Sequence, residues 1–322
     1  MKRLLGCLSL TAALLLALPM EALAADRLVP VGKVIGLQLK DGTVTVTAFD
    51  DALGMDARRA GLKIGDTVIA VEAKSVQGPE DIRRAVDAAG EMLNITVLRG
   101  GKKHTLKLPV KQTGEGKRLG IFLRQGIAGI GTVTWYDPES GAFGALGHGV
   151  SAGSGSLLQL TQGSAYRAEI LSVRKGKSGK PGQLKGSADA NAVCGSVLQN
   201  TPQGVFGKAE SGWAGEAMPV AELEDVRVGA ATIRSTVAAG EPRDYSVEIL
   251  KIYPSERRSC RNFLLKVTDS RLLEITGGIV QGMSGSPIIQ DGKLVGAVTH
   301  VLVNDPTRGY GIFIENMLDA AG

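Results

Sequence analysis

The chain has 322 residues, with 37 Lys and Arg against 32 Asp and Glu, which gives a formal net charge of +5. Its basic residues are dispersed, aromatic residues make up only 4%, and no nucleic-acid-binding motif is present, so we expect no nucleic-acid partner. The mild positive charge fits solubility or a location near an anionic membrane.

The N-terminus has the three-part layout of a secretory signal. Lys2 and Arg3 precede an uncharged apolar run over residues 4–20, and Ala22 and Ala24 provide the small residues that a signal peptidase reads. We therefore expect residues 1–24 to be a signal peptide and the protein to be exported. The run is shorter than the roughly 20 residues that span a bilayer, which favours cleavage, but retention as an N-terminal anchor stays open.

Cleavage after residue 24 would leave Cys194 and Cys260 as the remaining cysteines. In an exported protein they can form a disulfide or stay as two buried thiols, and the sequence leaves both open. No spacing of Cys and His matches a zinc site, so we expect neither a metal nor a cofactor.

Residues 29–110 show a pattern of short strands around one helix. The helix is predicted over residues 79–89, because a proline opens it, a glycine closes it, and Ile82 and Val86 lie on one apolar face. The turn and strand from Ala60 to Val71 precede this helix. We expect this stretch to fold as a separate domain.

The phrase Ala-Gly-Leu-x-x-Gly-Asp-x-x-x-x-Val, from Ala60 to Val71, resembles the most recognisable segment of PDZ domains. The resemblance implies that a peptide adds as a strand beside the long helix, with Ile82 and Val86 lining the groove or packing the core. It also implies a carboxylate-binding loop made of Val34, Ile35, Gly36 and Leu37. Self-association through this module is a further expectation.

Residues 111–118 contain two glycines and mixed charges, and they are predicted to be a linker. Beyond them, residues 119–322 contain many short strand-like runs separated by Gly, Asn, Ser and Asp-Pro, and only residues 316–321 look helical. This pattern indicates a β-barrel or sandwich, and about 200 residues suffice for two small barrels. The strand-like runs are 129–136, 168–173, 230–237, 245–253, 263–268 and 294–303.

The segment Gly-Met-Ser-Gly-Ser-Pro places Ser284 between two glycines. Gly282 and Gly285 lack Cβ, so the backbone can turn tightly and present the Ser284 hydroxyl in a cleft. The same bend can direct the N–H groups of Gly282 and Ser284 at one point, where a tetrahedral oxyanion would form. The alternative is a plain Gly/Ser/Pro turn between buried strands.

A serine nucleophile needs a base, and the chain has only three histidines. His104 lies beside two lysines on a predicted surface strand, where we expect a solvated side chain. His148 lies in a glycine-rich loop after a strand, and His300 ends the strand that follows the Ser284 turn. His148 is therefore the expected base, because it is flanked by glycines, as Ser284 is, and shares one β-rich domain with the serine.

A third group should orient the imidazole, and an acid is expected. We favour Asp269, which ends an apolar strand shortly before the serine turn, and keep Asp189 as the alternative. The full candidate set is Asp137, Asp189, Asp225 and Asp269.

Taken together, the chain resembles the stage IV sporulation protein B peptidase family. The order of signal, PDZ-like module and three motifs carries the resemblance: Gly-Ile-Gly-Thr-Val-Thr-Trp-Tyr-Asp-Pro (129–138), Gly-Ala-Leu-Gly-His-Gly (144–149) and Gly-Met-Ser-Gly-Ser-Pro (282–287). It implies a mainly β protein, with the PDZ-like domain followed by a chymotrypsin-like double β-barrel. It also implies a serine endopeptidase with Ser284 as nucleophile, His148 as base and Asp269 as acid.

The resemblance further implies a setting and a substrate. Such proteins act in the space between the two membranes around a forming endospore, where they cleave a membrane-bound regulator and their own N-terminal region. That cleavage frees an intramembrane metalloprotease to activate a late sigma factor. The chain differs from trypsin-like enzymes at one position of the serine motif, because they have Asp before the serine where this chain has Met283. Activation by pairing of a new N-terminus with that Asp is therefore in doubt.

In chymotrypsin-like enzymes the strand after the nucleophile turn lines the primary specificity pocket, so Thr299 and His300 are expected there; a core position for His300 is equally open. Two rival functions remain. One is a PDZ adaptor whose protease-like domain is catalytically inert. The other is an HtrA-like chaperone-protease, which the reversed domain order disfavours.

Overall fold

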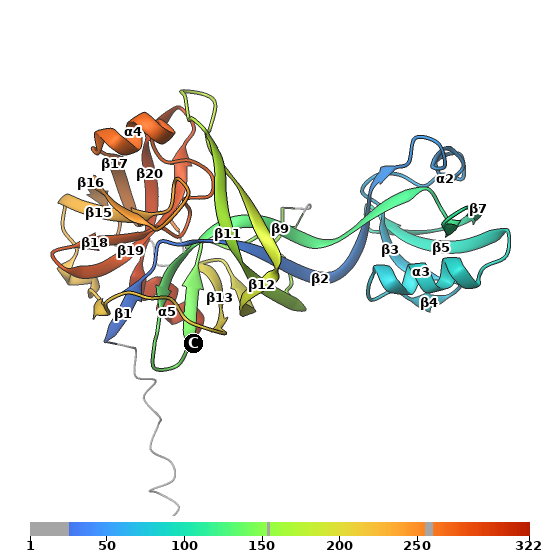
Figure 1. Cartoon of the computed structure of the whole chain (residues 1–322), viewed down its shortest axis with the longest axis horizontal. Coiled ribbons are helices and arrows are strands. Elements are labelled where there is room, and N and C mark those ends of the chain that lie inside the picture. Colours follow the sequence, from blue (N-terminus) through green and yellow to red (C-terminus); the bar gives the residue numbers. More distant parts are fainter. Residues whose placement is uncertain (1–25, 153–154, 255–259) are drawn as a thin grey trace, which may run out of the picture.

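The computed structural model describes residues 26–152, 155–254 and 260–322. The predicted signal segment lies outside the described residues. Within them, no helix is both long and apolar enough to cross a membrane. The described chain forms two β-barrels and a third, smaller unit (Figure 1).

The first barrel is a closed ring of strands. Some of these strands precede an insertion at residues 44–125 in the sequence, and the others follow it. Strand β9 pairs with β10 on one side and with β2 on the other, and β2 also pairs with β11, which closes the ring. The short strands β1 (Arg27–Pro30) and β14 (Met218–Pro219) extend it beside β9. In order around the ring, the strands are β2 (Val34–Phe49), β9 (Ile121–Tyr136), β10 (Ala142–Ala145), β13 (Gly204–Ala209), β12 (Gln183–Thr201) and β11 (Gln162–Arg174).

The second barrel is closed by antiparallel pairing alone and follows the first along the chain. Helix α4 (Ser270–Thr276) follows β17, and the C-terminal helix α5 (Ile314–Ala321) lies against β19 and β20. A short 3-10 helix, η1 (Leu223–Asp225), precedes the barrel. In order around the ring, the strands are β15 (Gly229–Ser235), β16 (Arg243–Ile252), β17 (Phe263–Val267), β20 (Asp305–Phe313), β19 (Lys293–Leu302) and β18 (Pro287–Gln290).

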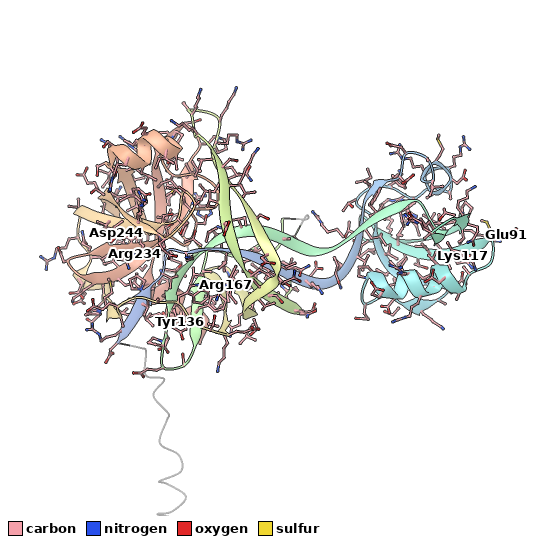
Figure 2. The ribbon with its side chains drawn as sticks, in the orientation of Figure 1. Glu91, Lys117, Tyr136, Arg167, Arg234 and Asp244 are labelled. Carbon is pink, nitrogen blue, oxygen red and sulfur yellow. The ribbon has the colours of Figure 1, made fainter. Side chains whose placement is uncertain are left out.

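Arg234 on β15 ties the second barrel to the strand that enters the first. Its guanidinium pairs with Asp244 across the strand and also donates to the Pro30 carbonyl at 3.1 Å (Figure 2). The Thr236 hydroxyl donates to the Gly32 carbonyl at 2.9 Å in the same region. These bonds hold the two barrels together at a fixed position.

The third unit, here called the inserted unit, comprises residues 44–125. It is built on the far ends of β2 and β9, which run without interruption out of the first barrel (Figure 1). It has its own apolar core, to which Ile82 and Val86 contribute. Its other elements are α2 (Met55–Arg59), β3 (Thr67–Val71), β4 (Lys74–Ser75), α3 (Pro79–Ala88), β5 (Met92–Arg99), β6 (Lys102–Pro109), β7 (Lys111–Thr113) and β8 (Gly116–Arg118).

A bulge marks the point where the two shared strands leave the barrel. Leu39 pairs with Ile127 and Val44 with Gln125, so residues 40–43 of β2 stand opposite Gly126 alone. Gly126 has φ +69°, and a Cβ there would lie 1.9 Å from the Leu39 carbonyl oxygen. The strands can therefore approach closely here only because this residue is glycine.

The predicted domain boundaries are wrong in one respect. A module at 29–110, a linker at 111–118 and a peptidase from 119 onward would place all of β2 outside the barrels. Instead, the first half of β2 belongs to the first barrel, and the inserted unit interrupts that barrel. Residues 111–118 form the β7–β8 hairpin, which the Lys117 ammonium attaches to α3 by donating to the Ala89 carbonyl (Figure 2).

Most local predictions are confirmed. The mainly β double barrel is present, the helix predicted at 79–89 is α3, and each predicted strand of residues 119–322 coincides with an observed one. The C-terminal helix is also found, beginning at Ile314.

Candidate active site

Ser284 lies on the turn between α4 and β18. Gly282 and Gly285 have φ of +100° and +94°, values that residues with a Cβ rarely adopt. A Cβ on Gly285 would lie 2.1 Å from the Thr132 carbonyl oxygen, so the turn packs tightly against β9. The Thr132 hydroxyl also donates to the Gly282 carbonyl at 2.8 Å. The predicted tight turn is therefore present, and β9 holds it in place.

His148 follows β10 in an equally constrained loop. Leu146 and Gly147 have φ of +71° and +68°, and the left-handed conformation of a leucine is strained. The Leu146 N–H donates to the Thr132 carbonyl at 3.2 Å, so the same residue of β9 contacts both the serine turn and the histidine loop. The loop thereby delivers His148 to the cleft between the barrels.

Ser284 and His148 line one cavity of about 390 Å³ between the two barrels. Its walls are mostly apolar, and no carboxylate lies among its described lining residues. The cavity is lined by Leu37, Leu39, Ile127, Gly129, Ile130, Leu146, His148, Val150, Ile279, Val280, Gln281, Gly282, Ser284, Thr299, His300 and Val301. The predicted nucleophile, base and specificity residues therefore meet at one place.

The Ser284 hydroxyl donates to the Thr299 carbonyl at 2.8 Å, and no hydrogen bond joins it to His148 in this conformation. His148 Nδ1 lies 3.0 Å from the Gly149 carbonyl oxygen. Because a carbonyl can only accept, this contact requires the proton on Nδ1 and leaves Nε2 with a lone pair. Burial lowers the pKa of His148, so the imidazole is neutral at pH 7 and can take up a proton.

Gly282 and Ser284, whose N–H groups are the predicted oxyanion donors, both line this cavity. Within the described residues neither donates a hydrogen bond, whereas the flanking N–H groups of Met283 and Gly285 do. Two free donors beside a serine are what an oxyanion hole requires. The predicted oxyanion hole is consistent with this backbone.

His300 packs against His148, with ring centroids 5.2 Å apart. Its Nδ1 is buried and has no hydrogen-bond partner among the described residues. Burial lowers the pKa of His300 to about 4, together with repulsion from the charge that His148 carries once it is protonated at low pH and from the charge of Arg261. His300 is therefore a neutral wall of the cavity at pH 7, and Thr299 beside it supplies the carbonyl that holds Ser284.

The structure does not bring Asp269 to His148. Asp269 is the N-cap of α4, and its carboxylate accepts from the main-chain N–H groups of Arg271 and Leu272. It also pairs with the Arg271 guanidinium at 2.7 Å, which holds the pKa of Asp269 well below its usual range. Its position before the serine turn reflects the start of a helix, and the predicted acid role has no support in this conformation.

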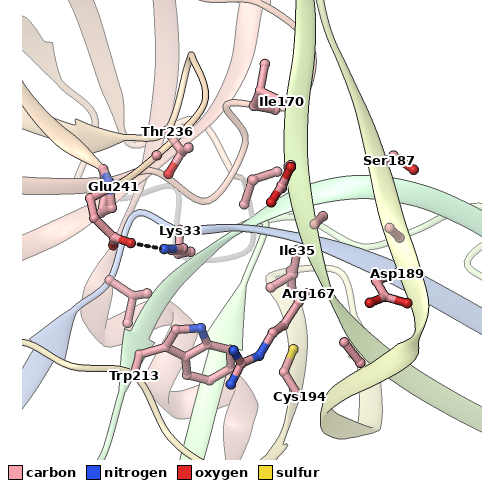
Figure 3. Close-up of a pocket in the computed structure, with 18 of the residues that line it drawn as sticks. Lys33, Ile35, Arg167, Ile170, Ser187, Asp189, Cys194, Trp213, Thr236 and Glu241 are labelled. Atoms are coloured by element: carbon pink, nitrogen blue, oxygen red, sulfur yellow. Dashed lines mark hydrogen bonds and ion pairs between the residues drawn. The ribbon is translucent and has the colours of Figure 1, made fainter.

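Asp189 does not reach His148 either. It lies on β12 at the wall of a second, larger cavity of about 950 Å³, together with Arg167 and Trp213 (Figure 3). Its carboxylate accepts from the Asn191 N–H at 2.9 Å, as in a local turn. The other two candidates have partners elsewhere, since Asp137 accepts from the N–H groups of Glu139 and Ser140 and Asp225 pairs with Lys293. None of the four carboxylates considered from the sequence therefore contacts the base.

The predicted carboxylate-binding loop is also misplaced. The residues Val34, Ile35, Gly36 and Leu37 belong to β2 within the first barrel, where Ile35 is 1% exposed and Leu37 faces the cavity that contains Ser284. Ile82 and Val86 do line a groove of the inserted unit, of about 360 Å³, but its other wall is residues 119–123 at the start of β9. The same apolar-Gly-apolar pattern occurs there as Leu119-Gly120-Ile121, which is the signal that could have located the groove.

Cys194 and Cys260 are both free thiols. Burial raises the pKa of Cys194 to about 11, so this thiol stays protonated and unreactive at neutral pH. Among the described residues, no three His, Cys, Asp or Glu side chains are grouped as a metal site requires.

A family model described as SpoIVB peptidase S55 matches residues 115–318. Among solved structures, the chain is similar to the inactive form of the Rv3671c protease, at 13% identity over 61% of this chain and 85% of that chain, with a TM-score of 0.35. An inactive serine-to-alanine mutant of Rv3671c from M. tuberculosis H37Rv gives 13% identity, 61% and 82% coverage and the same TM-score. Human heparin binding protein gives 13% identity, 56% and 72% coverage and a TM-score of 0.28. No curated protein matches the chain.

Proposed function

Because the chain belongs to the SpoIVB peptidase S55 family, we propose that it is a serine endopeptidase with Ser284 as nucleophile and His148 as general base. One observation carries the proposal: Ser284, His148 and Gly282 line one cavity, and the N–H groups of Gly282 and Ser284 donate no hydrogen bond within the described residues. The cavity lies between two closed β-barrels, where substrate can enter from the cleft.

The reaction follows from these positions. The Ser284 hydroxyl leaves the Thr299 carbonyl by rotation about χ1 and attacks the substrate carbonyl carbon, while Nε2 of His148 takes its proton. The oxyanion that forms accepts from the N–H groups of Gly282 and Ser284, each worth roughly 3 kcal/mol of barrier at the high end. His148 then gives the proton to the leaving amine, and water releases the acyl group by the same steps.

A second element concerns substrate recruitment. The groove between α3 and residues 119–123 has an apolar floor from Ile82 and Val86, and Phe122 is 54% exposed at its edge. These features support binding of an extended peptide as an added strand, as in PDZ domains. The groove is thus proposed to hold a segment of the protein substrate or of the chain's own N-terminal region.

The family also supports a setting for this activity. We propose that the protein is exported and acts between the two forespore membranes, where it cleaves a membrane-bound regulator and thereby allows a late sigma factor to be activated. The mildly basic chain is compatible with work beside an anionic membrane. Co-expression of the membrane-bound regulator with wild-type protein or with Ser284→Ala tests this step, because only the wild type should shorten the regulator.

Reaction with a fluorophosphonate tests the enzyme directly, because the reagent modifies only a serine that a base has activated. Wild-type protein should be labelled, whereas Ser284→Ala and His148→Ala should both lose labelling while keeping their thermal transition. The double mutant should be scarcely worse than either single one, because the pair acts as a unit. Equal labelling of wild type and Ser284→Ala would instead support an inert domain that serves as an adaptor.

A further inference from the structure

The loop that carries His148 is held by one side chain from β12, that of Asn200. The amide oxygen accepts from the Val150 N–H at 2.9 Å, and the amide nitrogen donates to the Val150 carbonyl at 2.9 Å and to the Leu158 carbonyl at 2.8 Å. Nearby, the Gly149 N–H donates to the Pro202 carbonyl at 3.1 Å. The amide of Asn200 is thus committed to this loop.

These hydrogen bonds also affect the orientation of His148, the proposed base. The N–H of Val150 and the carbonyl of Gly149 belong to the same planar peptide unit, so fixing one fixes the direction of the other. That Gly149 carbonyl is the group that lies 3.0 Å from Nδ1 of His148. Asn200 is therefore connected to the imidazole through a single rigid peptide.

We propose that Asn200 is a positioning residue for catalysis, which orients the Gly149 carbonyl so that His148 keeps its proton on Nδ1 and its lone pair on Nε2. This inference rests on the proposed peptidase function. A backbone carbonyl fixed by Asn200 does what a buried carboxylate does in other serine proteases: it selects the tautomer and the ring orientation.

The chain offers a matched control in the second barrel. Gln290 accepts from the Arg227 N–H at 3.0 Å and donates to the Arg227 carbonyl at 3.0 Å and to the Ala230 carbonyl at 3.1 Å. This clamp has the same three bonds as that of Asn200, but it lies outside the cavity that contains Ser284. A purely structural role would make the two clamps equivalent in every assay.

The first test compares Asn200→Ala with Gln290→Ala in the rate of fluorophosphonate labelling, with thermal unfolding measured on the same samples. Both variants should lower Tm, but only Asn200→Ala should slow labelling, by about 10²-fold, because a misplaced base is costly. Asn200→Asp keeps the acceptor for the Val150 N–H and loses the two donated bonds. It should therefore lose stability while labelling much faster than Asn200→Ala. Labelling of Asn200→Ala within two-fold of wild type, or equal slowing by Gln290→Ala, overturns the proposal.

The second test does not depend on activity. Long-range proton–nitrogen NMR spectra distinguish the two neutral tautomers of a histidine, and His148→Ala assigns the signals. Wild type, Asn200→Asp and Gln290→Ala should all show the proton on Nδ1 of His148, whereas Asn200→Ala should show a mixture. A proton on Nε2 in the wild type overturns the proposal even if Asn200→Ala does not fold. Absence of labelling in a wild type with the expected tautomer would instead contradict the peptidase assignment.

Discussion

The Thr132 hydroxyl donates a hydrogen bond of 2.8 Å to the carbonyl of Gly282, and this bond joins strand β9 of the first barrel to the nucleophile turn of the second. Thr132 is fully buried, and its own N–H donates to the Ser284 carbonyl at 3.2 Å. The position of the nucleophile therefore depends on a residue far from it in the sequence, which lies in the motif at 129–138 but to which the sequence had assigned no role.

Thr132→Val should distinguish the effect of this hydrogen bond from the effect of side-chain packing at the same position. The substitution keeps the shape of the side chain but removes the donor, which should cost about 1 kcal/mol and slow fluorophosphonate labelling by about ten-fold. Thr134 is the control, since it is equally buried on the same strand and its hydroxyl has no partner among the described residues. Thr134→Val should leave labelling unchanged and raise Tm by about 2–4 °C. Identical effects of the two variants on labelling would contradict the role of Thr132.

Asp269 provides a test of the acid assignment. As the N-cap of α4, it should tolerate Asn, because an asparagine side chain also accepts hydrogen bonds from the first turn. We expect Asp269→Asn to change kcat less than ten-fold and Asp269→Ala to lower stability by about 1 kcal/mol. A loss of about 10⁴ in kcat in the Asn variant, as expected for a catalytic acid, would show that Asp269 reaches His148 during turnover.

The peptide groove lies beside residues 119–123 and not at residues 34–37. Substitutions at Phe122 and Ile35 should therefore have different effects. Phe122→Asp places a charge at the groove edge and should weaken binding of an apolar peptide at least ten-fold, while labelling of Ser284 continues. Ile35→Asp places a charge in the core of the first barrel, because Ile35 is 1% exposed, and should abolish folding and both activities. Peptide titration by fluorescence anisotropy measures the first, and circular dichroism the second. Unchanged peptide binding in Phe122→Asp would remove the groove from recruitment.

His300 predicts a dependence of stability on pH. Its pKa is about 4 in the folded chain and about 6.5 when unfolded, so between these values the unfolded state binds more protons. Stability should therefore fall as the pH decreases from about 6.5 towards 4. His300→Phe keeps an aromatic ring beside His148 and should reduce this fall, with the titration of His148 still contributing. Urea unfolding at pH 7.5 and pH 5 measures the effect, and equal midpoint shifts in both proteins would contradict it.

The sequence by itself determined the local features of the site. The serine turn and the histidine loop could be predicted because glycines at Gly282, Gly285 and Gly147 mark conformations with positive φ, which are properties of single residues. The spacing of the apolar residues in α3 and the strand-like runs of the barrels can likewise be predicted from short stretches of sequence. That Ser284 and His148 share one β-rich domain also followed from the short strand-like runs and the turn residues between them.

Strand partners and buried contacts were decided by the tertiary structure alone. The strand β2 pairs with β9 and β11, far along the chain, and this pairing places Val34–Leu37 in a barrel and interrupts that barrel with the inserted unit. The carboxylate of Asp269 could be assigned to a helix cap, and Asn200 to the His148 loop, only once their partners were placed. A hydrogen bond between distant residues leaves no local pattern, because it depends on how the barrels close and pack.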